Sequence, residues 1–191
     1  MKIVIDDIEY PMKEMGIEQY QIITDNEKIG DAELISIFTD ASVETIKKAP
    51  FQDVKFVANY LRQMIQEDEM ESPLYLTYEF KGKEYGLIIP SKISYEEWIN
   101  LEVFLAKKPL DLKLLAAHLY KPLKEGEGEN RVLEPYSMEE CIKRSKEWGD
   151  FPMSVFISAL FFLGLFSQKY MDLTLSSLET KKTENKRKIK K

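Results

Sequence analysis

The chain has little of the residue types that build metal centres and nucleophilic sites. Its 191 residues include one cysteine, Cys141, and one histidine, His118. One cysteine excludes an intrachain disulfide, and the two residues together are too few for a structural zinc site. Cys141 lies in EECIKRS, where Glu139 and Glu140 would raise its pKa and weaken it as a nucleophile. We therefore predict no metal, no cofactor and no catalytic residue, with a Cys141–His118 pair as the disfavoured alternative.

Nucleotide-binding and calcium-binding motifs are also missing. The sequence contains no GxxxxGK[ST] loop, no GxGxxG fingerprint and no EF-hand spacing. The GEGE stretch at 126–129 lacks the basic residue that a phosphate loop needs. Carboxylates are frequent, but most fall in runs such as 67–71 that are typical of solvated surface. We predict that the protein is not an enzyme. The alternative is an active site whose carboxylates come from distant segments.

The chain has one long uncharged run, FPMSVFISALFFLGLFSQ at 151–168. A transmembrane helix usually needs about 20 strongly apolar residues, and this shorter run contains Pro152, Gly164 and several polar residues. We predict a buried core helix and no membrane contact, with a membrane anchor as the alternative. The N-terminal MKIVIDDIEY lacks an apolar stretch of signal-peptide length, so we expect no signal peptide.

Charge is unevenly distributed along the chain, whose formal net charge is −6. Residues 181–191 contain seven Lys or Arg and one Glu, so the remaining chain is strongly acidic and would repel a phosphate backbone. We predict a disordered basic tail over 179–191. Nucleic-acid contact by this tail is the less favoured option, because it has no aromatic residue for base stacking. Its principal cations are Lys186, Arg187, Lys188, Lys190 and Lys191.

Hydrophobic spacing predicts a mostly helical fold. Residues 51–68 carry apolar residues three and four positions apart, which indicates an amphipathic helix. Residues 74–80 and 84–89 are typical of two strands joined by a turn at Lys81-Gly82. The N-terminal residues 3–10 predict a further short hairpin. The fold class we predict is α+β, predominantly α-helical with one or two small β-hairpins.

Several residues mark where the predicted helices begin. Ser94 with Glu97 and Ser137 with Glu140 both have the S-x-x-E pattern of a capping box. Asp31 is predicted to cap the helix that follows it. The acidic run at 67–72 and Pro73 then suit a boundary between two units. We predict an N-terminal unit at 1–72 with a hairpin and helices, and a second unit at 73–178 with a hairpin and a helical bundle.

An ordered series of segments resembles small proteins encoded among the morphogenesis genes of tailed bacteriophages. The series comprises IEQYQII, LISIFTDASVETIKKAPFQDV, GKEYGLIIPSKISYEEWINLE, LAAHLYKP and PMSVFISALFFLGLF. Some proteins of this class are tail assembly chaperones. The chain departs from the pattern in KEGEGEN after LYKP and in its basic tail. The resemblance implies binding to other phage structural or tail proteins, in the host cytoplasm or in the virion, and supplies no catalytic residue.

From this resemblance we predict a phage assembly protein that is tail assembly chaperone-like. The first alternative is a minor virion structural component of head, neck or tail, and the second is a small host-directed or enzymatic phage protein. A homo-oligomer is a further option. The candidate partner-binding residues, each with core packing as its alternative, are Leu115, Leu119, Tyr120, Lys121, Pro122, Phe161, Phe162 and Phe166.

Overall fold

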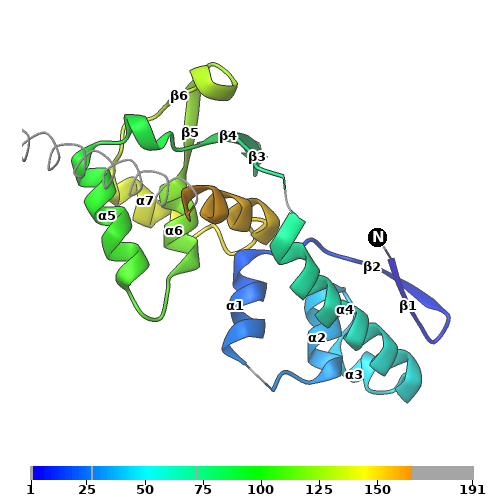
Figure 1. Cartoon of the computed structure of the whole chain (residues 1–191). Helices are drawn as coiled ribbons and strands as arrows, with labels where there is room; N and C mark the ends of the chain where they lie inside the picture. Colours follow the sequence, from blue (N-terminus) through cyan, green and yellow to red (C-terminus); the bar gives the residue numbers. More distant parts are fainter. Residues whose placement is uncertain (1, 27, 72, 165–191) are drawn as a thin grey trace, which may run out of the picture.

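The structure is a computed structural model that describes residues 2–26, 28–71 and 73–164, with the backbone alone at 66–71 and 129. Figure 1 shows a mostly helical chain with its two small antiparallel sheets at the periphery of the helices. The predicted α+β class, mainly helical, is confirmed. The predicted tail cations Lys186, Arg187, Lys188, Lys190 and Lys191, and the candidate Phe166, lie outside the described residues.

The first part of the chain builds a hairpin and a helical layer. Strands β1 (Lys2–Ile5) and β2 (Ile8–Pro11) pair antiparallel, with Asp6 and Asp7 in the left-handed backbone region that a tight turn requires. Helices α2 (Asp31–Phe38), α3 (Val43–Ile46) and α4 (Phe51–Glu71) follow. Their apolar faces and the inner face of β1 form one core. It comprises Ile3, Ile5, Leu34, Ile35, Phe38, Ala41, Ile46, Val57, Ala58 and Leu61.

The second part of the chain builds a four-stranded antiparallel sheet in the order β3-β4-β5-β6. Its strands are β3 (Thr77–Phe80), β4 (Lys83–Leu87), β5 (Tyr120–Glu125) and β6 (Val132–Leu133). The 3-10 turns η1 (Pro90–Lys92) and η2 (Gly128–Asn130) lie in its connections. Helices α5 (Tyr95–Ala106), α6 (Leu112–Leu119), α7 (Met138–Ser145) and a helix at 153–164 complete this part.

Aromatic side chains fill the centre of the second core. Trp148 stacks on Phe151 with ring centroids 4.5 Å apart, and Tyr85 meets Trp148 edge-on at 5.0 Å. Phe80 contacts both Trp148 and Phe151. The helix at 153–164 buries Val155, Phe156 and Ala159 against this centre. No helix within the described residues is long and apolar enough to cross a membrane.

Helix α1 (Ile17–Asp25) precedes α2 in sequence but packs in the second core. Its first residue, Ile17, is fully buried there and donates its N–H to the carbonyl of Phe151 at 3.0 Å. Glu18 likewise donates its N–H to the carbonyl of Gly149, at 2.8 Å. The buried residues of the first core thus come from 3–61, and those of the second core come from 80–159 together with Ile17 of α1.

One local prediction is wrong, and one strand was not predicted. Asp31 does not precede α2 as its cap but is the first helical residue, and Gly30 takes the cap position. The side chain of Glu33 accepts the N–H of Gly30 at 2.9 Å, so an acidic side chain satisfies that terminus from inside the helix. Residues 120–125 form strand β5, which the hydrophobic spacing did not predict.

Candidate functional site

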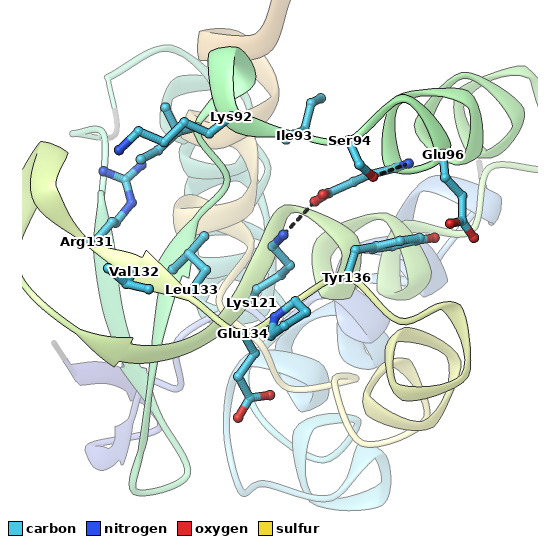
Figure 2. Close-up of a pocket in the computed structure, with 13 residues that line it drawn as sticks. Lys92, Ile93, Ser94, Glu96, Lys121, Arg131, Val132, Leu133, Glu134 and Tyr136 are labelled. Atoms are coloured by element: carbon cyan, nitrogen blue, oxygen red, sulfur yellow. Dashed lines mark hydrogen bonds and ion pairs between the residues drawn. The ribbon is translucent and has the colours of Figure 1, made fainter.

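A pocket of about 480 Å³ opens between the start of α5, β5 and the segment 131–136. Figure 2 shows Ser94 and Glu96 on the α5 side, with Arg131, Val132 and Leu133 on the opposite side. The apolar part of the lining comprises Ile89, Ile93, Val132, Leu133 and Pro135. A space of this size is within the range of small-molecule sites.

A buried ion pair forms one wall of this pocket. Lys121 Nζ lies 2.9 Å from Glu97 Oε1, and their side chains are only 10% and 3% exposed (Figure 2). The two atoms are not aligned as a hydrogen bond, so charge attraction holds them together. Ser94 caps α5 by accepting the N–H of Glu97 at 3.1 Å. The side chain of Glu97 does not complete the predicted capping box, because it turns inward to Lys121.

Arg131 fixes the loop that borders the pocket. Its Nε and Nη2 donate to the carbonyl of Leu87 at 2.8 and 2.6 Å, and its Nη1 donates to the carbonyl of Gly128. These bonds tie the 126–131 segment to the end of β4, and Arg131 is 5% exposed. The observed contacts of the Arg131 guanidinium thus orient the protein's own backbone.

His118 and Cys141 are both buried beside this polar wall. The ring of His118 lies edge-on between Phe104 and Tyr136, with centroid separations of 5.3 and 5.2 Å. Neither of its ring nitrogens has an aligned hydrogen-bond partner. Burial, with the nearby cations Lys121 and Arg144, lowers the pKa of His118 to about 4. A histidine in this state is neutral at pH 7.

Cys141 has the environment of a structural thiol. Its Sγ faces the carbonyl of Leu114 at 3.8 Å, and burial raises its pKa to about 11. Glu139 and Glu140 were the expected cause, but desolvation raises this pKa most, and the carboxylates that add to it are those of Glu97 and Asp111. Since a thiol in this state is not an activated nucleophile, the geometry gives no support to the Cys141–His118 pair. No cluster of potential metal ligands occurs among the residues that the structure describes.

A second candidate surface lies where α5 meets the helix at 153–164. A groove of about 330 Å³ is lined by Trp98, Leu101, Glu102, Leu105, Leu160, Leu163 and Gly164. Glu102 is the charged member of this lining, and it accepts a hydrogen bond from Trp98 Nε1 at 2.8 Å. Phe161 is 68% exposed and lies one turn from Gly164, on the same side of its helix. The result is an apolar groove, with the exposed Phe161 outside its lining on the neighbouring face of the same helix.

The structure separates the predicted partner-binding residues into buried and accessible ones. Leu115, Leu119 and Tyr120 are fully buried, and Pro122 is buried in β5 beside Tyr85, so these four pack in the core. Lys121 reaches the pocket through its pairing with Glu97. Of the phenylalanines, Phe162 packs partly against the second core, whereas Phe161 projects outward.

Two features of these surfaces were not found from sequence. The S-x-x-E pattern placed Glu97 at a helix start, but nothing in that pattern indicated that its carboxylate would face Lys121. The apolar residues of α5 were not considered as a surface, although Tyr95, Ile99 and Val103 recur at four-residue spacing. No protein-family model, curated protein or solved structure matches the chain.

Proposed function

We propose that the chain is a protein-binding factor that acts in phage tail or virion assembly, and that it contacts its partner through the groove between α5 and the helix at 153–164. The observation that supports binding is the exposure of Phe161 beside an apolar groove. An aromatic side chain that is mostly exposed next to apolar surface is a common anchor of protein interfaces.

The chemistry of the groove indicates the kind of segment that fits. Apolar side chains of the partner would fill the space between Trp98, Leu105 and Leu160. Glu102 would favour a Lys, Arg or amide N–H at the rim, because one of its oxygens already accepts from Trp98 and the other is left for the partner. The occupant is therefore an apolar segment of a tail or virion protein with a donor at its edge.

The buried chemistry of the second core supports binding over catalysis. Lys121 and Glu97 pair with each other, Arg131 holds backbone carbonyls, and His118 is enclosed by two aromatic rings. Glu97, Lys121 and Arg131 are thus engaged by groups of the protein itself, and His118 is held neutral by its burial. The phage context itself comes from the resemblance of the sequence to tailed-phage morphogenesis proteins.

Site-specific photo-crosslinking tests this proposal. A photoreactive residue replaces Phe161 in the full chain, in cells producing the tail and virion proteins encoded beside it. The matched control replaces Ile142, which is 41% exposed on α7. We expect a crosslink to a tail or virion protein from position 161 and none from position 142. The same products from both positions, or none from 161, would contradict the proposal.

Mass spectrometry of purified particles and of the lysate distinguishes the two assembly roles. A transient chaperone is abundant in the lysate and absent from particles. A minor structural component is present in particles at fixed copy number. Either result is compatible with binding through the groove, because the crosslinking experiment tests that surface separately.

A further inference from the structure

The outward face of α5 carries an apolar stripe that is distinct from the groove. Tyr95 is 81% exposed, Ile99 37% and Val103 58%. Residues four positions apart project from the same side of a helix, so these three form one continuous line. The opposite side of α5 buries Glu97, Leu101 and Phe104. The stripe therefore lies on the side of α5 that faces away from the second core.

The charges beside this stripe are opposite at its two ends. Glu96 is exposed in the first turn of α5, and Lys107 is exposed at its C-terminal cap. The two residues are separated by about three helical turns, so they flank the stripe on the same side. The acidic end and the basic end of one helix face thus complement each other in an antiparallel arrangement.

A two-fold axis perpendicular to the helix would bring two copies of this face together. This axis makes the two α5 helices antiparallel and places the Glu96–Lys107 side of one helix beside the Glu96–Lys107 side of the other. Val103 then meets the partner's Ile99, and Tyr95 lies near the partner's Lys107. The pair of Glu96 with the partner's Lys107 forms twice, once at each end. The surface is therefore self-complementary: its apolar residues face apolar residues, and its acidic end faces the partner's basic end.

We propose that the α5 stripe, formed by Tyr95, Ile99 and Val103, is a two-fold docking surface for a second copy of this chain. The inference does not depend on the proposed function, because the stripe and the groove are neighbouring but different faces of α5. A contact built on one helix is smaller than the roughly 800 Å² per partner of a stable interface. We expect a reversible dimer whose population rises with concentration.

Sedimentation velocity of the full chain across a concentration series tests the dimer. Val103→Glu places two carboxylates at the centre of the contact and should raise the dissociation constant by at least about tenfold. Ile142→Glu on α7 adds the same charge elsewhere and should leave the dissociation constant unchanged. A chain that stays monomeric at every concentration, or a dimer unaffected by Val103→Glu, would overturn the proposal.

Charge reversal tests the antiparallel geometry. Lys107→Glu should weaken the dimer, and adding Glu96→Lys should restore it, since each copy then pairs with reversed signs. Thermal melting verifies that each variant is folded, because a lysine in the first turn of α5 opposes the helix dipole. A folded double variant that stays as weak as Lys107→Glu would overturn the arrangement. The proposal would also be overturned if the chain is monomeric and Val103→Glu abolishes crosslinking to a tail protein. That result would assign the stripe to another partner.

Discussion

The two cores of the molecule differ in what they bury. The first core, from β1, β2 and α2–α4, is made of aliphatic side chains and Phe38. The second core buries aromatic rings together with Glu97, His118, Lys121 and Arg131. An aliphatic core needs only close packing, whereas buried charges must be matched in position. The second core is therefore the part of the molecule with more demanding electrostatic requirements.

Ion pairs of the two parts show the same contrast. In the first part Asp31 contacts Lys55 and Arg62 at 2.7 and 2.8 Å, and the side chains of these two cations are 49% and 40% exposed. In the second part the Glu97–Lys121 pair is almost completely buried. Solvent screens the former and not the latter. Ion pairs with similar distances should therefore contribute differently to stability. Variants of the two sites test this difference.

The largest effect is expected at the buried pair. Lys121→Met leaves the carboxylate of Glu97 buried without its counter-charge and should lower the free energy of unfolding by about 3–5 kcal/mol at pH 7. Adding Glu97→Leu removes the stranded charge and should recover much of the loss. Urea denaturation of both single variants and the double variant gives the coupling energy. Simple additivity would show that the two groups do not interact.

A pH effect of the next size is expected from His118. Its pKa falls from 6.5 in the unfolded chain to about 4 in the folded protein, so the unfolded state binds the proton more readily. The free energy of unfolding has its full value above pH 6.5. It decreases as the pH falls toward 4, by about 3 kcal/mol in total. Urea denaturation at pH 7, 5.5 and 4.5 measures this loss.

His118→Phe provides the matched control for that titration. It retains an aromatic ring between Phe104 and Tyr136 but cannot take up a proton. Since the chain has one histidine, the dependence of stability on pH between 6.5 and 5 should become much shallower in this variant. An unchanged dependence would assign the effect to carboxylates instead.

Local sequence patterns were sufficient for elements that depend on neighbours in the chain. The helix predicted at 51–68 is present as α4, because its apolar spacing matches one helical face. The turn predicted at Lys81-Gly82 is present, and both residues adopt the positive φ values, 52° and 72°, that such a turn requires. These features are encoded within a few residues.

Features set by distant residues were not recoverable in this way. Strand β5 begins at Tyr120 directly after α6; Pro122 indicates that the helix ends, but only the pairing with β4 makes the following residues a strand. Glu97 carries a helix-start pattern, yet its side chain is fixed by Lys121 on another element. The pocket and its ion pair therefore required tertiary structure.

An intermediate effect is expected where the first half of the chain joins the second core. A Cβ at Gly16 would lie 2.7 Å from Asp150 Cα and 2.8 Å from the carbonyl oxygen of Gly149. Gly16→Ala should force α1 away from this backbone and lower the free energy of unfolding by about 1–3 kcal/mol. The control is Ala32→Gly in α2, which changes the backbone preference of one residue without creating a steric clash. Thermal and urea denaturation of both variants measure the difference. An unchanged stability for Gly16→Ala would mean that α1 shifts freely.

The smallest effect is expected at the solvent-screened ion pairs of the first part. Hydrogen bonds from Lys55 and Arg62 hold the pKa of Asp31 below its usual value, against the opposing effect of burial. Because the folded pKa is lowered, the contribution is present above the unfolded value near 3.8 and is lost as the pH falls through the folded pKa. Asp31→Asn should cost at most about 1 kcal/mol at pH 7, and less at high salt. Denaturation in low and high salt, compared with Lys121→Met, measures this contrast directly. If Asp31→Asn lowers the free energy of unfolding as much as Lys121→Met does, and salt affects neither loss, then burial does not explain the difference between the two ion pairs.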